Sequence, residues 1–517
     1  MFNCPILRPL TLLALFSSYA LCGSVTVSVP FAAPSSAPTI SPSVISLSIE
    51  LDRWTDWSGN TTRNQFFFNT LNNLKQIAGE GPRLRIGGDT EDHADFSPTV
   101  KYATATFKAP TAATPYFEAS NVIVGDGFYQ VADFVPPGTH FTWGVNFKRG
   151  NMTTMFSEAR SLLKAFASPA LANMTLDYIE IGNEVGGMTL PAYVQEWTGY
   201  ATNITSSLNM GKTKFWGGAF AATTHTTDGF SPQGIFANGI LNSHPGSLMT
   251  SFSQHHYSGG CTPDAPITGK LQYLMDKALL RSNLTHLNAD IAAVHAQGLD
   301  YVLGETNSNA CHGTPGVSNV GGTALWMLDH AIFGAEIGIS RMYFHEGIGY
   351  KYNLIQPVTL TISTIDGTPL PKPLPPHVQP QYYGAIVAAE AIGNSGATRV
   401  VELSINDPRI SGHAFFVGNK LVRAVIINSL VYLTTDAGTP RNSTLVNLNI
   451  SGSGAPTKMT VKRLFMPFSD STSGLTWGGQ TYETSDGRVG GSLKVTTANV
   501  ADGVVVQASE AVLLTFM

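Results

Sequence analysis

The sequence predicts a (β/α)8 TIM barrel followed by a C-terminal antiparallel β-sandwich, and three observations carry this prediction. The chain has 517 residues, which is long for one ordinary domain. Between residues 40 and 395, short apolar runs alternate with amphipathic stretches of helical period. From 396 to 517 that period disappears, and apolar runs are separated by Gly, Ser, Asp and Thr. Repeated β-then-α units favour a closed parallel barrel, whereas short strands between turn residues favour a sandwich.

The barrel region contains eight apolar runs that we interpret as its strands. They are Ile45–Ile49, Arg83–Ile86, Phe141–Asn146, Leu176–Ile181, Phe215–Trp216, Ser251–His255, Tyr301–Leu303 and Arg341–Phe344. The predicted helices have apolar residues every three or four positions. They are Gln65–Ala78, Met155–Phe166, Ala192–Leu208, Leu271–Leu279, His286–Gln297, Thr323–Ile337 and Tyr382–Ile392. The proline-rich stretch 369–380 precedes the last helix, so we assign it to the last βα loop of the barrel.

The predicted sandwich has no helical pattern. Its expected strands are Phe415–Val417, Leu421–Ile427, Ser443–Ile450, Met459–Leu464, Ser492–Thr496 and Val504–Val506. Residues 24–39, with the apolar run Thr26–Val29, are expected to join this domain from the N-terminal side.

The N-terminal segment predicts the compartment. Arg8 precedes the apolar run Leu10–Phe16, and small residues near Ala20 suit a cleavage site. The run is far shorter than the ~20 residues of a membrane span, so we interpret residues 1–23 as a signal peptide and the protein as secreted and extracellular. Only 13% of residues are charged, so hydroxyls, amides or attached sugars must help to keep the surface soluble.

Cysteine and asparagine usage agree with secretion. Removal of the signal peptide takes away Cys4 and Cys22, which leaves Cys261 and Cys311 as the expected disulfide. Seven Asn-x-Ser/Thr sequons are candidate glycosylation sites. They are Asn60, Asn151, Asn173, Asn203, Asn283, Asn442 and Asn449.

Several classes of partner and chemistry have no support. The net charge is −5 without a basic run, which argues against nucleic acid and anionic membrane as partners. No Gly-x-Ser-x-Gly elbow is present, and Gly211–Thr213 lacks the upstream glycine of a phosphate loop, so no cofactor is expected. His255, Cys261, Cys311 and His312 match no common zinc spacing, so no metal is expected either.

Two strand-like runs end in a glutamate. Tyr178–Val185 contains Asn183-Glu184, and Tyr301–Asn307 contains Glu305. A lone Asn-Glu is more often an ordinary surface carboxylate. Two glutamates at the C-terminal ends of separate barrel strands are what glycosidic cleavage requires, because one protonates the leaving oxygen while the other attacks the anomeric carbon or activates water. We therefore interpret Glu184 and Glu305 as the catalytic pair.

Other carboxylates follow barrel strands. Glu346 at the end of the last strand is a rival catalytic group, whereas Glu180 lies within its strand. Glu50 and Asp89 end the first two strands, and we assign them to substrate binding, with loop ordering or helix capping as an equally plain alternative.

Two tyrosines also follow strands of the predicted barrel. Tyr257 could place its phenol against the nucleophilic carboxylate, although a packed core tyrosine is the simpler interpretation. Tyr350 follows the last strand beside Lys351, in a loop whose aromatic and basic character suits a sugar carboxylate.

Five motifs together resemble glycoside hydrolase family 79, and especially its fungal β-glucuronidases. They are Ile179–Glu184, Leu303–Asn307, Arg85–Gly88, His255–Tyr257 and Gly313–Asn319. The resemblance covers nearly the whole chain after residue 23. It implies a (β/α)8 retaining glycosidase with Glu184 as general acid/base and Glu305 as nucleophile. It further implies that Glu50 binds sugar hydroxyls and that Tyr257 contacts the nucleophile.

The resemblance also implies how a glucuronate carboxylate is bound. The loop after the nucleophile contributes Gly313 through its backbone, and Tyr350 contributes from the loop after strand eight. Where related enzymes can offer a tyrosine in the first of these loops, this chain has Cys311-His312. We hypothesise that His312 substitutes as the donor.

The implied function is a secreted retaining exo-β-glucuronidase. It would remove terminal β-linked glucuronic acid, or its 4-O-methyl form, from glycans such as arabinogalactan-type side chains. Two alternatives remain open at this point: a heparanase-like endo-β-glucuronidase, which the acidic balance disfavours, and a non-catalytic glycan-binding wall protein, which the presence of both glutamates disfavours.

Overall fold

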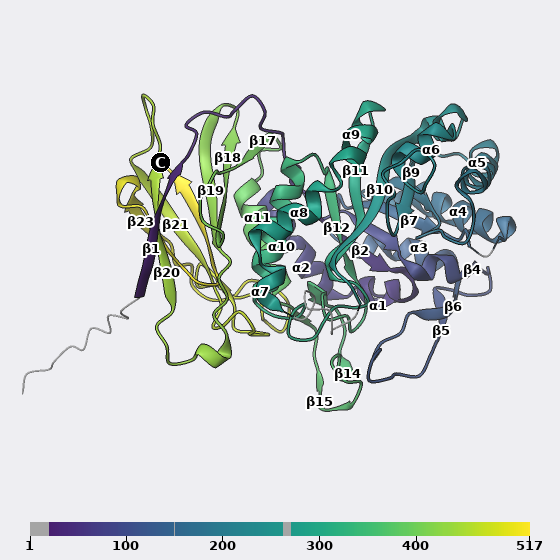
Figure 1. Ribbon diagram of the computed structural model, residues 1–517. Coiled ribbons are helices and arrows are strands. Elements are labelled where there is room, and N and C mark those ends of the chain that lie inside the picture. The colour runs from purple at the N-terminus through teal and green to yellow at the C-terminus, as the bar shows by residue number, and fades with distance from the viewer. Residues whose placement is uncertain (1–19, 149, 262–269) are drawn as a thin grey trace, which may run out of the picture.

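The computed structural model describes residues 20–148, 150–261 and 270–517, and it contains a barrel and a sheet domain side by side (Figure 1). Eight parallel strands close the barrel. They are β2 (Ile45–Glu50), β3 (Leu84–Gly87), β7 (His140–Val145), β8 (Thr175–Ile181), β9 (Lys214–Phe220), β10 (Met249–Gly259), β11 (Asp300–Asn309) and β12 (Arg341–Glu346). Each overlaps a predicted strand, so the predicted (β/α)8 fold is confirmed.

Helices surround the barrel on its outer face. They are α1 (Trp54–Ser58), α2 (Gln65–Ala78), α3 (Asp126–Gln130), α4 (Met152–Phe166), α5 (Leu190–Ser207), α6 (Pro232–Ala237), α7 (Leu271–Leu274), α8 (Lys277–Thr285), α9 (Asn288–Ala296), α10 (Gly322–Glu336) and α11 (Gln381–Ile392). The sequence dictates their ends locally: α2 begins where the side chain of Asn64 accepts the Phe67 amide and stops at Gly79, whose φ of 79° suits glycine. Helices α10 and α11 are buried almost all round because they lie between the barrel and the sheet domain (Figure 1).

Two insertions emerge from the barrel. A small sheet of β4 (Ala94–Phe96), β6 (Ala119–Val124) and β5 (Ala103–Phe107) lies between barrel strands β3 and β7. The last βα loop contains β13 (Ile355–Gln356), β14 (Leu360–Ile362), β15 (Pro369–Leu374) and β16 (His377–Val378), in agreement with its predicted place before α11. The small sheet was not predicted, because its short, half-exposed strands carry little apolar signal.

The C-terminal domain consists of two sheets. One pairs β1 (Ala20–Ser28), β20 (Asn442–Asn449) and β24 (Val504–Gln507). The other has the order β17 (Thr398–Glu402), β18 (Ile410–Val417), β19 (Lys420–Asn428), β25 (Glu510–Phe516), β21 (Lys458–Phe465) and β22 (Thr476–Trp477), with β23 (Thr496–Asn499) on β21. Apolar side chains of both sheets form a separate core that includes Val27, Phe416 and Leu514. The predicted antiparallel sandwich is therefore confirmed as a fold class.

One predicted strand is wrong and three were missed. The expected strand Ser492–Thr496 is replaced by β23, which starts only at Thr496, because Leu493 is 57% exposed and its segment has no buried face. Strands β17, β22 and β25 were not among the expected strands, although each is paired along its length.

The N-terminal prediction lies largely outside the described residues. Of the expected signal peptide, only residues 20–23 are described, and they belong to β1, which runs parallel to β20. Within the described part of the chain, no helix is long and apolar enough to cross a membrane.

Candidate active site

Glu184 and Glu305 meet at the carboxyl ends of the barrel strands. Glu305 lies on β11, and Glu184 follows the end of β8. One oxygen of each carboxylate and one ring nitrogen of His255, on β10, lie within 4.8 Å of one another. The two side chains differ in burial, since Glu305 is 9% exposed and Glu184 is 34% exposed. The topology therefore brings together the two glutamates that the sequence singled out.

The backbone after β8 turns sharply to aim Glu184 into the barrel mouth. Gly182 has a φ of 79°, and a Cβ there would lie 2.7 Å from the side chain of Phe147. Glu184 itself has a φ of 45°, and its amide donates to the carbonyl of Ala219 across 2.8 Å. A left-handed conformation costs a non-glycine residue about 1 kcal/mol, and such strain gathers at functional sites.

Glu305 is held as an anion by groups from three other strands. Tyr257 donates to its Oε1 across 2.6 Å, and Arg85 Nη1 donates to its Oε2 across 2.8 Å. His345 and His255 approach Oε2 at 3.6 Å and 3.9 Å. Burial alone would raise the pKa of Glu305, but these positive charges and the phenol hold it well below its ordinary value.

Arg85 contacts carboxylates that come from two other barrel strands. It is fully buried and, besides Glu305, contacts Glu180 at 2.6 Å and Asn183 Oδ1 at 2.6 Å. Although burial opposes its charge, the carboxylates of Glu180 and Glu305 raise its pKa above the ordinary value. Sequence reasoning assigned it no role; an arginine inside an otherwise apolar barrel strand was the available signal.

Glu184 has a different environment. Its Oε1 shares a hydrogen bond of 2.9 Å with Nδ1 of His255, and the structure gives it no arginine partner among the described residues. His255 thus lies between the two glutamates. One carboxylate is buried and fixed in the charged form, whereas the other is half-buried at the open edge, and such unequal pairs are able to divide acid and nucleophile roles.

A metal ion is the other occupant that this spacing could suit. Glu184, His255 and Glu305 together satisfy the distances of a three-ligand site. Both oxygens of Glu305 already accept hydrogen bonds, from Tyr257 and from the permanently charged Arg85. A fixed guanidinium at 2.8 Å opposes a cation in the same place, so the donor set does not fit a metal.

Glu50 organises the loop after β3. It accepts the backbone amides of Asp89 and Thr90 at 3.1 Å and 3.2 Å and lies 3.3 Å from Nε2 of His345. Asp89 is 52% exposed and approaches Lys148 at 3.9 Å. Burial raises the pKa of Asp89, with a further contribution from Glu50. Both residues lie near the barrel mouth, and Glu50 at least performs the loop-ordering role.

The rival carboxylate is unavailable for catalysis. Glu346 is fully buried and accepts the backbone amides of Leu354 and Ile355 at 2.8 Å and 3.2 Å. Burial raises its pKa well above the ordinary value. An enclosed carboxyl group whose oxygens are held by backbone amides of a loop cannot attack a substrate at the mouth.

A second cluster lies beside the glutamates. The rings of His312 and Tyr350 stack with centroids 3.9 Å apart, and His345 links them to Glu305 because its ring lies 6.0 Å from that of Tyr350. Cys311 and Cys261 form the predicted disulfide, which pins this loop, and Gly313 follows with a φ of 82°. The predicted residues of both loops are therefore brought together. Lys351, the expected cation, is buried, and burial lowers its pKa.

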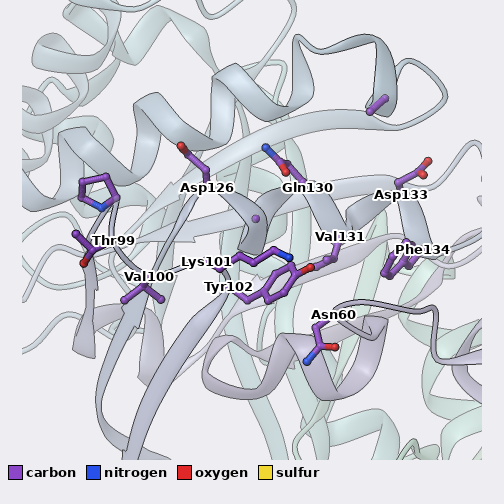
Figure 2. Close-up of a pocket in the computed structure, with 13 residues that line it drawn as sticks. Asn60, Thr99, Val100, Lys101, Tyr102, Asp126, Gln130, Val131, Asp133 and Phe134 are labelled. Atoms are coloured by element: carbon purple, nitrogen blue, oxygen red, sulfur yellow. The ribbon is translucent and has the colours of Figure 1, made fainter.

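A cavity of about 510 Å³ lies elsewhere on the barrel (Figure 2). Asn60, Tyr102 and Asp133 are among the residues that line it. None of its lining residues belongs to the cluster around Glu184 and Glu305, so the cavity is separate from the candidate active site.

Comparisons with known proteins agree with this architecture. A model of the glycosyl hydrolase family 79 C-terminal beta domain matches residues 412–513. A β-glucuronidase of Aspergillus niger is 29% identical over 507 residues, which covers 89% of this chain and 88% of that protein. A β-glucuronidase of Neurospora crassa is 27% identical over 540 residues, with coverage of 92% and 93%.

Solved structures share the fold. A 4-O-α-L-rhamnosyl-β-D-glucuronidase from Fusarium oxysporum superposes with a TM-score of 0.78 at 24% identity, over 95% of this chain and 100% of that one. A family 51 arabinofuranosidase from Xanthomonas axonopodis pv. citri has a TM-score of 0.62 at 13% identity, over 96% and 100%.

The fold, the pair of carboxylates and the similarity to β-glucuronidases together define the chain as a glycoside hydrolase with a (β/α)8 barrel. The matched C-terminal domain and the two fungal relatives narrow this class. Residues 412–513 match the C-terminal beta domain of glycoside hydrolase family 79, and over most of its length the chain is similar to two fungal β-glucuronidases.

Proposed function

We propose that the chain is a secreted, retaining exo-β-glucuronidase. The observation that carries the proposal is the approach of Glu184 and Glu305, whose nearest carboxylate oxygens lie within 4.8 Å. Retaining glycosidases hold their two carboxyl groups roughly 5–5.5 Å apart, whereas inverting enzymes need about 6.5–9.5 Å to admit a water between them. The separation therefore favours a double displacement.

The proposed nucleophile is Glu305. Because Arg85 and Tyr257 keep it anionic and fixed in orientation, its carboxylate can attack the anomeric carbon as the aglycone departs. Glu184, in its protonated form, gives its proton to the departing glycosidic oxygen. This first step leaves the sugar esterified to Glu305 and Glu184 ionised.

The second step reverses these roles. The Glu184 carboxylate takes a proton from a water molecule, whose oxygen attacks the anomeric carbon and expels Glu305. The sugar leaves with its original β configuration and both glutamates regain their starting states. His255, hydrogen-bonded to Glu184 and close to Glu305, is placed to steady the acid/base side chain through both steps.

The proposed substrate is a terminal β-linked glucuronic acid or its 4-O-methyl form on arabinogalactan-type side chains. The two β-glucuronidase relatives support the sugar. Sugar hydroxyls would be bound by Asn183, Glu50 and Asp89. The carboxylate would be bound by the His312 ring, the backbone of Gly313 and the Tyr350 phenol; the His312 and Tyr350 rings stack on one another, and His345 lies between Tyr350 and Glu305.

Three features support secretion. The disulfide between Cys261 and Cys311 is a feature of oxidising compartments. All seven sequon asparagines are exposed or half-buried, so none of them is enclosed in the core. The low charged fraction of 13% agrees with a surface that carries sugar.

The test is the release of 4-nitrophenol from its β-glucuronide, β-glucoside, β-galactoside and β-xyloside by wild type, Glu305→Ala and Glu196→Ala. Glu196 is an exposed residue of α5 and serves as the matched control. We expect glucuronide-selective turnover that only Glu305→Ala abolishes, with the β anomer of the product appearing first by NMR. Turnover of a neutral sugar alone would overturn the substrate, and an initial α anomer would overturn retention. If the folded protein cleaves none of the four substrates, an endo-acting enzyme or a binding protein is favoured.

A further inference from the structure

A carboxylate of the chain itself already occupies the surface formed by His312 and Tyr350. Oε1 of Glu118 lies 2.5 Å from Nε2 of His312 and accepts a hydrogen bond of 3.0 Å from the Tyr350 hydroxyl. The Glu118 side chain is 26% exposed, so it lies at the open side of the cluster. The structure thus shows that this imidazole and phenol bind a carboxylate, although no sequence argument pointed to Glu118.

Glu118 reaches this place from a different loop of the barrel. It ends the loop between β5 and β6, which belongs to the insertion after barrel strand β3, whereas His312 and Tyr350 follow β11 and β12. The loop is also attached to the insertion after β12 by Tyr116, whose hydroxyl donates to the carbonyl of Ile362 across 3.0 Å. The side chain of Glu118 is therefore the part of the loop that meets the sugar-carboxylate surface.

The charges around Glu118 make this contact selective for an anion. Burial alone would raise the pKa of Glu118, but the hydrogen bond and charge of His312 lower it to about 2, so its carboxylate is ionised. Its acidic neighbour Asp52 behaves differently, because burial and then the charge of Glu50 raise the pKa of Asp52 to about 8. At neutral pH Glu118 thus supplies the negative charge that His312 and Tyr350 bind.

We propose that Glu118 is a specificity-determining residue: in the resting enzyme its carboxylate occupies the sugar-carboxylate subsite, and an incoming uronate displaces it from His312 and Tyr350. The inference rests on the proposed function, because it assumes that this pair binds the uronate. The exchange replaces one charge-assisted hydrogen-bonded pair by another, so an incoming uronate regains the interaction energy that is lost when Glu118 leaves. A sugar with a neutral C6 hydroxyl regains less of this energy, and the difference in binding energy discriminates against it.

The opposite view is that Glu118 only positions its two partners. On that view, removal of the Glu118 carboxylate would loosen His312 and Tyr350 and weaken uronate binding. On the displacement view, the same removal eliminates a competitor and strengthens uronate binding. The two views predict changes of opposite sign in one measured quantity.

The experiment uses the full chain as wild type, Glu118→Gln, Glu118→Ala and the exposed-glutamate control Glu196→Gln. We measure the competitive inhibition constant of free D-glucuronate and the KM and kcat for 4-nitrophenyl β-D-glucuronide. Both Glu118 variants should lower the inhibition constant and KM about tenfold with little change in kcat, since a charged competitor with two hydrogen bonds is removed. The Glu196 variant should match wild type.

The outcomes separate this inference from the proposed function. If wild type hydrolyses the glucuronide but the Glu118 variants bind glucuronate equally or more weakly, the displacement is refuted while the function stands. If neither wild type nor the Glu118 variants bind glucuronate or cleave its glycoside, both the displacement by uronate and the proposed function are refuted. Turnover that appears only in the Glu118 variants would support the displacement most directly.

Discussion

Replacement of Tyr257 by phenylalanine removes one defined interaction from the proposed nucleophile. The phenol donates to Oε1 of Glu305 across 2.6 Å, while Arg85 independently holds Oε2 across 2.8 Å. With both donors present the carboxylate has one orientation. With Arg85 alone it is free to rotate about the remaining contact, so the attacking oxygen is aimed less often at the anomeric carbon.

The size of the effect follows from the kind of bond. A hydrogen bond to a charged group contributes roughly 1.5–3 kcal/mol, which corresponds to a fall in kcat/KM of about 10- to 100-fold. The phenol also helps to lower the pKa of Glu305, so its loss raises that pKa and moves the acid limb of the pH–rate profile to higher pH. Arg85 and the two nearby histidines remain, so Glu305 stays ionised at neutral pH.

The assay is the pH dependence of kcat/KM on 4-nitrophenyl β-D-glucuronide. Tyr382→Phe is the matched control, because it also removes a buried phenol that donates 2.7 Å to a backbone carbonyl, that of Thr70, away from Glu305. The control should lose stability but keep the wild-type profile. A Tyr257→Phe enzyme with unchanged kcat/KM and an unmoved acid limb would refute the role given to this phenol.

Three further predictions concern the acid/base group, the disulfide and acid stability. Glu184→Gln should lose most activity on substrates with poor leaving groups while retaining it on activated aryl glycosides, and added azide should restore the second step as a β-glycosyl azide; wild-type rates on poor leaving groups would contradict the assignment. Opening the 50-residue loop closed by Cys261 and Cys311, with serine at both positions, should lower the free energy of unfolding by roughly 4 kcal/mol in denaturant titrations, and an unchanged midpoint would contradict this. Burial lowers the pKa of His256 and of His330 to about 3 from 6.5, so the unfolded chain binds more protons between these values and stability should fall as pH falls through that window. By pH 4 the loss is about 3 kcal/mol for each histidine; His330→Gln should flatten the decline of Tm, and a Tm that is constant from pH 7 to pH 4 would exclude the effect.

Local sequence patterns were sufficient for the barrel. Parallel strands buried on both faces appear as short apolar runs, and the helices between them have clear amphipathic periods, so each of the eight strands could be located from neighbouring residues alone. The same reasoning failed at Ser492–Thr496, where apolar residues lie on the surface. Local patterns do not show whether an apolar run has a partner to pack against.

The two glutamates illustrate the same limit at the site. Their place at strand ends could be predicted, since barrel strands present their carboxyl ends at one mouth. Their separation and charge could not, because the pKa of Glu305 depends on Arg85, His345 and His255, which come from three other strands. Likewise only the fold removes Glu346 from consideration, by enclosing it beneath a loop.

The sequence by itself determined the order of the eight barrel strands, the disulfide pair and the strand ends at which Glu184 and Glu305 lie, because each depends on residue types and local patterns. Only the tertiary structure decided which carboxylate is held as an anion, which is enclosed beneath a loop, and that Glu118 meets His312 and Tyr350 at the mouth. Electrostatic and hydrogen-bond energies depend on distance and burial in space, and residues far apart in the chain have no pattern that encodes either.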